Sequence, residues 1–260
     1  IIENFEGLSR FAAGIDRLDT FYGLLTGTAA SRSPERGRIV SIEDSRLALE
    51  RVTLQTPRSE RILVRELSIT VQPGEGLMIV VASGTGKSSL LRAIGGLWYA
   101  GSGTILRPPE GDLLFLPQQP YMFAGTLRSQ LLYPDVDRHV PDRRLQELLE
   151  QVNLPELARR FGGLDAEMDW EKVLSIGEQQ RLAFARVLHI QPRFAILDEA
   201  TSALDAANES HLYRQLARTS TTLVSVGHRP AILQYHRQVL ELTGDGQWRV
   251  HSAEGYRFGQ

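Results

Sequence analysis

Residues 80–91, VVASGTGKSSLL, decide the fold of this chain. An apolar run breaks into small residues and resumes after a lysine and two serines, which predicts a strand, a tight loop and the first turn of a helix. Gly84 and Gly86 have no Cβ, so the backbone N–H groups around them can turn inward toward a polyphosphate. A helix that starts near Lys87 adds N–H donors, the Lys87 ammonium reaches the outer phosphates, and the Ser88 hydroxyl is a suitable Mg²⁺ ligand. The stretch therefore predicts a phosphate-binding loop.

One position departs from the full phosphate-loop pattern G-x-x-x-x-G-K-[ST]. The pattern has glycine where this chain has Val81, which is followed by Ala82. A β-branched residue does not readily adopt positive φ, so either the loop entry is strained or the strand extends further. A small-residue turn between any strand and helix would also fit these letters, and both interpretations stay open from this stretch alone.

A second stretch, FAILDE at residues 194–199, is an apolar strand that ends in two acids. In an open parallel sheet, ligands bind beyond the carboxyl ends of the strands, so Asp198 and Glu199 are expected beside the phosphate loop. Asp198 would then hold Mg²⁺ and Glu199 would polarise the attacking water as a general base. The alternative is a strand that simply ends in solvated acids.

A third stretch, LSIGEQQR at residues 174–181, precedes the apolar run LAFARVL. Ser175 and Gly177 stand where a helix begins, with Glu178 in its first turn, so this helix start predicts a second anion-binding site. Read by itself, the serine three residues before a glutamate is also an ordinary helix N-cap.

Composition excludes several classes of function. The 260 residues are 42% hydrophobic and 23% charged, with a formal net charge of −2, which gives no overall reason to expect binding to nucleic acid or anionic lipid. There is no cysteine, hence no disulfide, zinc-thiolate site or thiol nucleophile, as fits a reducing compartment. No apolar run reaches the roughly 18 residues that a membrane-spanning helix needs.

The order of the predicted segments indicates a mostly parallel sheet with covering helices. We expect short antiparallel strands between residues 39 and 71, and over 101–118 a hairpin-like return and a strand that finishes at Gln118. The chain begins without methionine, which suggests that an upstream part is missing. The expected divisions are an amphipathic helix at 1–25, a linker at 26–38, a main domain at 39–250 and a tail at 251–260.

Taken in order, these stretches resemble the nucleotide-binding domain of ABC transporters over residues 39 to about 250. VASGTGKSS is similar to the Walker A motif except at its first glycine, Gln118 to the Q-loop, and LSIGEQQR to the signature. FAILDE is similar to the Walker B motif with its catalytic glutamate, SALD at 202–205 to the D-loop, and His228 to the switch histidine. Six motifs in the expected order leave little room for a chance match.

This resemblance implies an α/β fold of the P-loop NTPase class that binds ATP and Mg²⁺. Its parts would be a mostly parallel RecA-like core sheet, an antiparallel β-subdomain, and a helical subdomain at about 119–182 that carries the signature. The implied catalytic residues are Glu199, His228, Lys87 and Gln118. The implied nucleotide-binding residues are Ser83, Gly84, Thr85, Gly86, Lys87, Ser88, Ser89, Ser175, Gly177, Glu178 and Asp205. The implied metal ligands are Ser88, Gln118 and Asp198.

The resemblance also implies partners. Two copies would sandwich two ATP molecules head to tail, and no nucleic acid is expected. The wording of GEQQRLAFAR, GTGKSSLLRAIGGLW and LPQQPYMFAGTLRSQLLYP looks most like subfamily D, the peroxisomal acyl-CoA transporters and their bacterial half-transporter relatives. In these proteins a membrane domain precedes the ATPase domain, so the helix at 5–25 looks like the end of the last membrane helix. Just after the Q-loop, Tyr121, Met122 and Phe123 look like a docking region for the membrane domain.

That resemblance sets the expected place and cargo of the protein. The domain would face the cytosol from a membrane, most naturally the bacterial plasma membrane, with the peroxisomal membrane as the alternative. Acyl-CoA or fatty acid, cobalamin and peptide are all compatible substrates.

Two other functions stay open on the sequence. A soluble ABC-type ATPase of DNA repair or translation would need a long coiled-coil insertion or two motif sets, whereas about ninety residues separate Lys87 from Ser175 and one motif set is present. A nucleotide-binding regulatory module with impaired hydrolysis is favoured only by Val81 and Ala82.

Overall fold

The computed structural model describes residues 37–57, 61–81 and 85–258. The chain divides into two units, Ile1–Arg38 and Ile39–Gln260, and only the second is described in full detail below. The predicted helix at 1–25 lies outside the described residues, as does the predicted linker at 26–38 apart from its last two residues. In the described ranges, no helix has both the length and the apolar character that crossing a membrane requires.

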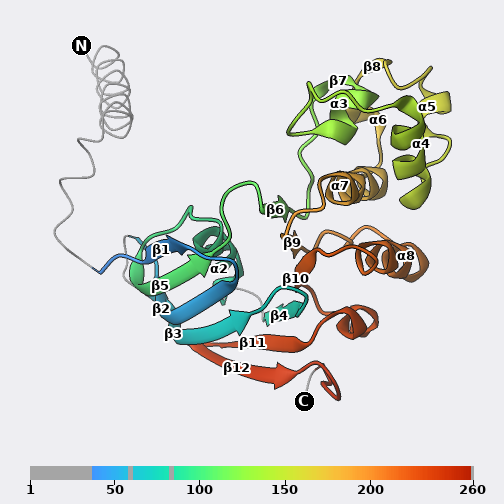
Figure 1. Cartoon of the computed structure of the whole chain (residues 1–260). Coiled ribbons are helices and arrows are strands. Elements are labelled where there is room, and N and C mark those ends of the chain that lie inside the picture. The colour runs from blue at the N-terminus through green and yellow to red at the C-terminus, as the bar shows by residue number, and fades with distance from the viewer. Residues whose placement is uncertain (1–36, 58–60, 82–84, 259–260) are drawn as a thin grey trace, which may run out of the picture. The chain divides into compact units, whose positions relative to one another are not determined.

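A six-stranded sheet forms the centre of the second unit (Figure 1). Its strands, in spatial order, are β12 (Gln247–Ser252), β11 (Gln238–Gly244), β4 (Leu77–Val81), β10 (Thr222–Val226), β9 (Phe194–Asp198) and β6 (Leu113–Leu116). β12 runs antiparallel to β11, and every other neighbouring pair in this sheet is parallel. The predicted mostly parallel core is therefore confirmed, although β12 continues two residues into the segment predicted as a tail.

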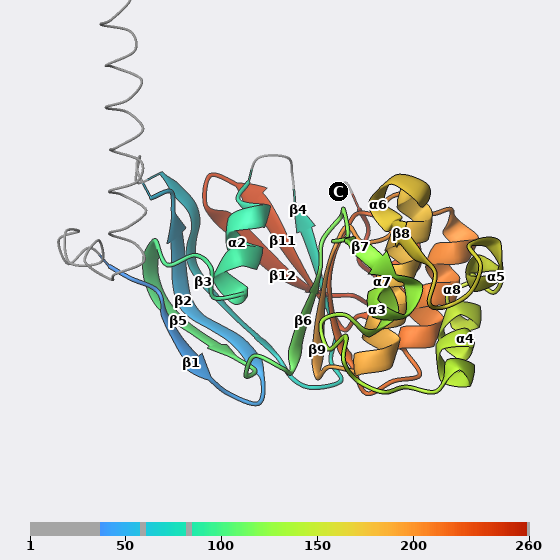
Figure 2. The ribbon, with the colours of Figure 1, turned by 90° about the horizontal axis from the view of Figure 1, so that it is seen from above.

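The central strands are apolar along their whole length because both of their faces are covered. All five residues of β10 and the first four of β9 are buried. Continuous apolar runs of this kind are typical of parallel strands between two layers of helices or sheets. Figure 2 shows α2 (Lys87–Ile94) on one face of the sheet, with α7 (Ile176–Ile190) and α8 (Ala206–Leu216) on the other.

A second, four-stranded sheet covers α2. Its order is β1 (Val40–Glu43), β5 (Gly101–Arg107), β2 (Leu47–Gln55) and β3 (Ile62–Val71). β2 is antiparallel to both β3 and β5, as predicted for this region, while β1 is parallel to β5. One buried apolar cluster fills the space between this sheet, α2 and the core sheet.

The predicted hairpin-like return over 101–118 is wrong. β5 pairs with β2 in the small sheet, whereas β6 pairs with β9 in the core sheet. Glycines explain the choice of partner, because a Cβ on Gly101 would lie 1.8 Å from the carbonyl oxygen of Thr53, and one on Gly103 would lie 2.4 Å from that of Arg51. β5 can approach β2 this closely only without side chains at these positions.

Residues 119–182, predicted as a helical subdomain, hold four short helices before α7, with one small addition. The helices are α3 (Leu127–Leu132), α4 (Asp142–Gln151), α5 (Leu157–Arg160) and α6 (Trp170–Val173). The addition is a two-stranded antiparallel sheet of β7 (Ala124–Thr126) and β8 (Glu167–Asp169). A short 3₁₀ helix, η2 (Pro230–Tyr235), follows β10.

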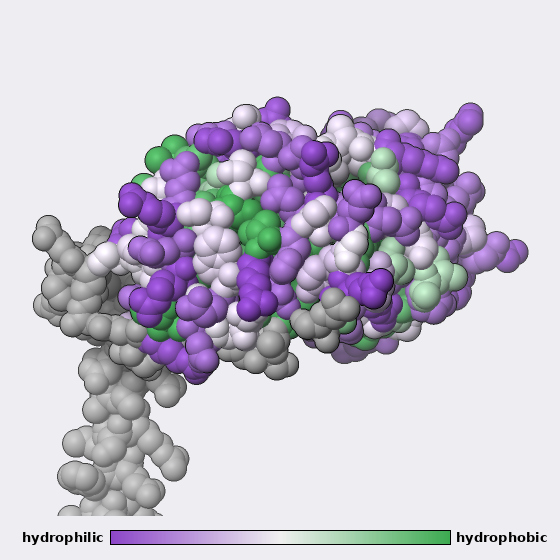
Figure 3. Space-filling view, turned by 90° about the horizontal axis from the view of Figure 1, so that it is seen from below, coloured by the Kyte–Doolittle hydropathy of each residue, from purple (hydrophilic) through white to green (hydrophobic). Residues whose placement is uncertain are grey.

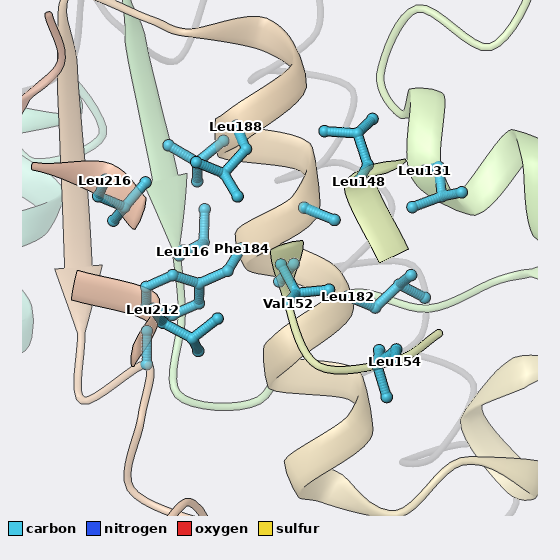
Figure 4. Close-up of a cluster of buried hydrophobic side chains, with 14 of the residues drawn as sticks. Leu116, Leu131, Leu148, Val152, Leu154, Leu182, Phe184, Leu188, Leu212 and Leu216 are labelled. Atoms are coloured by element: carbon cyan, nitrogen blue, oxygen red, sulfur yellow. The ribbon is translucent and has the colours of Figure 1, made fainter. Parts of the chain in front are cut away.

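Helix α7 is enclosed on both sides, which makes it the structural centre of this half of the unit. Figure 4 shows Phe184 and Leu188 pointing to one side, toward Leu212 of α8, and Leu182 pointing to the other side, toward Leu154. A helix that is apolar around most of its circumference is buried around most of it. By contrast, the face shown in Figure 3 is largely polar, with apolar residues in small groups.

Candidate functional site

The carboxyl ends of β4, β9 and β10 lie side by side at one edge of the core sheet. Val226 of β10 is in register with Asp198 of β9 and with Ile79 of β4. Glu199 follows β9 directly, and His228 follows β10 after one glycine. Because ligands of parallel sheets bind beyond this edge, the position agrees with the predicted site.

Lys87 and two carboxylates form the charged centre of this edge. The Nζ of Lys87 lies 2.5 Å from Glu199 Oε1 and 3.2 Å from Asp198 Oδ1. Burial alone would lower the pKa of Lys87, but the two carboxylates outweigh burial and raise that pKa above its usual 10.5. The ammonium therefore keeps its charge at neutral pH, as a phosphate-binding group must.

The backbone of Glu199 adopts a left-handed conformation. Its φ is 47°, which is uncommon for a residue other than glycine. Its N–H donates to the carbonyl of Val226 at 3.2 Å, and its carbonyl accepts from the N–H of Ser202 at 3.0 Å. Strained conformations of this kind gather at functional sites, where the surrounding structure holds them in place. Nothing in the letters FAILDE signals this feature.

The residues at this edge fit a magnesium ion. Asp198 Oδ1 is buried and accepts no hydrogen bond from the described residues, although the Lys87 ammonium lies close to it. An anionic oxygen of this kind is the ligand that Mg²⁺ prefers. The described ranges hold no group of three or more His, Cys, Asp or Glu side chains that could bind a metal. Further ligands would be oxygens of hydroxyl, amide, phosphate or water.

The helix that follows the phosphate loop starts without a side-chain cap. Gly86 precedes α2 with φ 98°, and no side chain accepts a hydrogen bond there. Val81 is the last residue of β4 and pairs with Leu242 of β11, so the strand extends to the position where the motif has glycine. This is one of the two outcomes that the sequence left open.

The other residues predicted for the phosphate loop are only partly placed. Thr85 and Ser89 are half-buried and Ser88 is exposed. The predicted residues Ser83 and Gly84 lie outside the described residues, as does Ala82.

Helix α7 starts with a closed cap. The Oγ of Ser175 accepts from the Glu178 N–H at 3.3 Å, and Glu178 Oε2 accepts from the Ser175 N–H at 2.9 Å. This reciprocal arrangement is a capping box. It occupies two of the N-terminal donors that the sequence assigned to an anion site, and leaves the N–H groups of Ile176 and Gly177 without a partner among the described residues.

Glu178 is also tied to a cation. Arg160 Nη1 lies 2.6 Å from Glu178 Oε1. Burial alone would raise the pKa of Glu178, but hydrogen bonds from Arg160 and Ser175 outweigh burial and hold that pKa below its usual 4.5. The carboxylate is therefore ionised at neutral pH and its charge is balanced locally.

The remaining predicted residues occupy two different settings. Gln118 and His228 are both exposed. Asp205 caps α8, because its Oδ1 accepts from the Asn208 N–H at 2.7 Å, and hydrogen bonds from Asn208 hold the pKa of Asp205 below its usual 3.8.

The structure therefore joins part of the predicted set directly. Lys87, Asp198 and Glu199 are in contact, whereas no hydrogen bond or ion pair within the described ranges links them to Ser175 or Glu178. The second group, at the start of α7, stands apart within one copy of the chain.

Arg186 is a buried cation that the sequence analysis missed. It is only 6% exposed, and its guanidinium donates to the carbonyls of Gln130 at 2.7 Å and Tyr121 at 2.8 Å and lies over the Tyr133 ring. Burial lowers the pKa of Arg186 to about 10, so it stays charged at neutral pH. Arg186 thus fixes the loop after Gln118. In that loop Met122 is buried, while Tyr121 is exposed.

Two further residues near the site were also missed. Gln180 and Arg229 each hydrogen-bond to the segment that follows Glu199. For Gln180 the only available signal was its place inside LSIGEQQR, and for Arg229 it was its position next to His228.

The sequence of this chain is similar to those of known proteins. A family model described as ABC transporter matches residues 64–202, just over half of the chain. An uncharacterized ABC transporter ATP-binding protein of Synechocystis sp. is 52% identical, over 96% of this chain and 39% of the relative. ABC transporter D family member 2, chloroplastic, of Arabidopsis thaliana is 36% identical, over 98% of this chain and 46% of the relative. The human lysosomal cobalamin transporter ABCD4 is 43% identical, over 80% of this chain and 36% of the relative.

The chain thus spans less than half the length of each of these relatives. The resemblance to subfamily D is confirmed by the two relatives whose names carry that letter. Because the family model covers more than half of the sequence, the chain belongs to the ABC transporter family, whose ATP-binding domains hydrolyse ATP.

Proposed function

We propose that this chain is the ATP-hydrolysing domain of a membrane half-transporter. Lys87 binds the outer phosphates of ATP, and Glu199 takes a proton from the attacking water as a general base. Gln118 and His228 contact the γ-phosphate, and a second copy supplies Ser175 and Gly177 from across the nucleotide. Such a site acts by positioning the reacting groups and by neutralising charge, as phosphoryl transfer requires.

The single observation that carries this proposal is the contact of Lys87 with Asp198 and Glu199. One ammonium is shared by two carboxylates at the sheet edge where a phosphate loop and an acid-ended strand meet. When the phosphates of ATP bind Lys87, they compete with these carboxylates for it. The Glu199 carboxylate then leaves its ion pair with Lys87 and can face the attacking water.

Asp198, Ser88 and Gln118 are the proposed holders of a magnesium ion. Bound there, Mg²⁺ would neutralise charge on the phosphate oxygens. Asp198 supports this role because its buried oxygen accepts no hydrogen bond from the described residues. Ser88 supports it through its exposed position in the first turn of α2.

The proposed assembly is a head-to-tail dimer with ATP between the two copies. Within one copy the start of α7 has no contact with the Lys87 group among the described residues, which supports a role for Ser175 toward another copy. Thr85, Gly86 and Ser89 line the same nucleotide, together with Ser83 and Gly84. Glu178 and Asp205 are proposed nucleotide-binding residues as well.

Transport, the membrane and the cargo are proposed from the relatives. We place the domain on the cytosolic face of a membrane, with a membrane domain upstream in the same polypeptide and no nucleic-acid partner. The proposed membrane is the bacterial plasma membrane, with the peroxisomal membrane as the alternative. The cargo classes are acyl-CoA or fatty acid, cobalamin, which one relative's name carries, and peptide.

The test is ATP hydrolysis and ATP-dependent dimerisation of this chain and of Glu199→Gln. We expect the parent to hydrolyse Mg-ATP and the variant to lose at least about 100-fold in turnover, the upper part of the range for removing a general base. The variant should keep ATP binding and form a stable dimer by light scattering, because it binds ATP without cleaving it.

Glu167→Gln is the matched control, because Glu167 is an exposed glutamate on β8. Its turnover should match that of the parent. Full turnover in Glu199→Gln refutes the assigned base. A parent that neither binds nor hydrolyses ATP, while Val81→Gly does, shows that the phosphate loop of this chain is impaired.

A further inference from the structure

Gln180 lies at a junction of three segments that are far apart in the sequence. It is on α7, and its side chain is fully buried. Its amide nitrogen donates to the carbonyl of Gln118 at 2.8 Å and to the hydroxyl of Ser202 at 3.1 Å, while its amide oxygen accepts from the N–H of Ala203 at 3.1 Å. One side chain of α7 therefore connects that helix to the loop at Gln118 and to the segment after Glu199.

The chemistry of these partners fixes the orientation of the amide. A glutamine offers two N–H donors and one carbonyl acceptor. Both donors of Gln180 are used, and the backbone N–H of Ala203 can only donate. Exchanging the amide oxygen and nitrogen would place the oxygen against the Gln118 carbonyl and two N–H groups against each other. The junction is thus satisfied in one arrangement only.

The segment 202–204 is held from its other side by Arg229. Its guanidinium donates to the carbonyl of Leu204 at 2.9 Å and of Ser202 at 3.2 Å, and pairs with the buried Glu209 at 3.3 Å. Arg229 follows His228 directly, so the segment is connected to the predicted phosphate-contacting histidine as well as to α7. Gln180 and Arg229 together clamp this short stretch.

The first turn of α7 also packs closely on the segment 202–204. A Cβ on Gly177 would lie 3.3 Å from the carbonyl oxygen of Ala203 and 3.3 Å from Leu204 Cδ2, tighter than ordinary contact. Because the packing is this tight, the position of the start of α7 depends on the position of the segment 202–204. Since α7 is enclosed on both sides (Figure 4), a shift of one partner is transmitted as a displacement and is not absorbed by a void.

We propose that Gln180 is a positioning residue for ATP hydrolysis. It keeps the backbone at Gln118 and the segment 202–204 in a fixed relation to the start of α7. Gln180 thereby fixes the position of the two loops that contact the γ-phosphate in one copy. It fixes them relative to the Ser175 end of α7, which faces the other copy. This inference rests on the proposed function, because it assigns Gln180 a task in the same hydrolytic site. Gln180 itself touches neither nucleotide nor water in this role.

Gln180→Met tests the proposal with a side chain of similar volume and no hydrogen bonds. We expect kcat for ATP to fall at least about tenfold while KM changes less than about threefold, because the reacting groups lose alignment and the nucleotide keeps its contacts. Hydrogen exchange at the Ala203 amide should accelerate at least about tenfold, since its acceptor is gone.

Gln179→Met is the matched control, because Gln179 is the adjacent glutamine and is equally buried. Its amide donates to the carbonyls of Glu171 and Leu174, and among the described residues it makes no hydrogen bond to Gln118 or to the segment 202–204. We expect a comparable loss of thermal stability, with the Ala203 amide still protected and a smaller change in kcat. Equal losses of kcat in the two variants overturn the proposal, since Gln180 would then be only structural.

Gln180→Glu keeps the proposal testable if the methionine variant does not fold. An ionised carboxylate cannot donate to the Gln118 carbonyl, whereas a protonated one can. The kcat of this variant relative to the parent should therefore rise as the pH falls from about 8 to about 6, the range that a buried carboxyl can titrate. A flat ratio overturns the assigned bond to Gln118.

The two proposals fail differently. A parent chain that hydrolyses no ATP refutes the proposed function. The hydrogen-exchange measurement then still tests the bond from the Ala203 N–H to Gln180. That bond is refuted if the Ala203 amide is unprotected in the parent, or if its exchange rate is unchanged in Gln180→Met.

Discussion

The starts of α2 and α7 are built in opposite ways, although both were predicted to bind phosphate. α2 begins after Gly86 with no side-chain cap, while α7 begins with the capping box of Ser175 and Glu178. Every helix N-terminus carries unsatisfied N–H groups and a partial positive charge. No side chain caps these donors in α2, and we expect them to serve a ligand, whereas α7 satisfies two of them with its own side chains.

The charged groups also differ between the two helix starts. Beside α2, the Lys87 ammonium contacts two carboxylates, so an anionic ligand that binds the lysine releases negative groups. At α7 the single carboxylate of Glu178 is neutralised by Arg160. From this comparison we expect the α2 end to change partners when a nucleotide binds, whereas the α7 end keeps the contacts that it already has.

Among the variants that test the difference between the two helix starts, Lys87→Met is expected to have the largest effect. The change leaves Asp198 and Glu199 side by side without their cation and removes the ammonium that binds phosphate. We expect the rate of ATP hydrolysis at saturating Mg-ATP to fall by at least about 100-fold, which is typical when one group that stabilises transition-state charge is removed. Lys172→Met is the control, because Lys172 is the other lysine of the chain and pairs with Asp169 in an exposed position. Equal activity of parent and Lys87→Met would show that the α2 end does not bind the phosphates.

Gly86→Ala tests whether the open start of α2 depends on its backbone conformation. Gly86 has φ 98°, and an added Cβ would lie 2.9 Å from Leu63 Cβ. Gly162→Ala is matched, because Gly162 has φ 90° and nothing within 4 Å of an added Cβ. Left-handed strain alone costs about 1–2 kcal/mol, so both variants should lose that much in urea unfolding. Gly86→Ala should lose more, and its ATP affinity should fall. Identical losses would mean that Leu63 moves aside freely.

Ser175→Ala removes the cap of α7 and so tests the closed end. We expect about 1 kcal/mol of lost unfolding free energy, typical of an N-cap serine replaced by alanine. Thr126→Ala is the control, because Thr126 caps α3 by accepting from the Ser129 N–H at 3.0 Å. Both variants should be destabilised to a similar degree in chemical denaturation, and only Ser175→Ala should lower hydrolysis. A drop in hydrolysis in both would assign the effect to stability alone.

The smallest effect concerns the pH dependence of the closed end. The folded-state pKa of Glu178 lies below its usual value, so its stabilising contribution is present above about pH 4.5 and is lost as the pH falls through the folded pKa. Glu178→Gln has no carboxylate to protonate. Unfolding free energies of parent and variant should therefore converge between about pH 5 and pH 3. Curves that stay parallel over this range would show that Arg160 does not stabilise the ionised form.

Much of the site could be predicted because its signals are local. The apolar strand FAILDE ends in acids whatever surrounds it, and the parallel order of the strands brings that end to the phosphate loop. The contact of Lys87 with Asp198 and Glu199 confirms this neighbourhood. For the serine and glutamate three residues apart, the sequence left an N-cap open beside an anion site, and the capping box confirms the N-cap. The roles of these residues in binding and catalysis stay predictions.

Other features could not be predicted because their partners are distant in sequence. The stretch 101–118 contains two strands whose apolar patterns fit a hairpin equally well. Only the close approach that Gly101 permits toward Thr53 places β5 in the other sheet. Gln180 reads as an ordinary residue of a helix, yet its partner Gln118 lies 62 positions earlier. Arg186 likewise has no pattern that would reveal its burial.

The sequence by itself determined which residue types stand at the strand ends and helix starts, because periodicity and capping depend on neighbours within a few positions. It thereby determined the fold class and the identity of the charged groups at the site. Only the tertiary structure decided that the α2 start is open, that the α7 start is balanced by Arg160, and that Gln180 ties three segments together. The physical reason is that these contacts depend on how α7 is packed between the sheet and the outer helices, which no local pattern encodes.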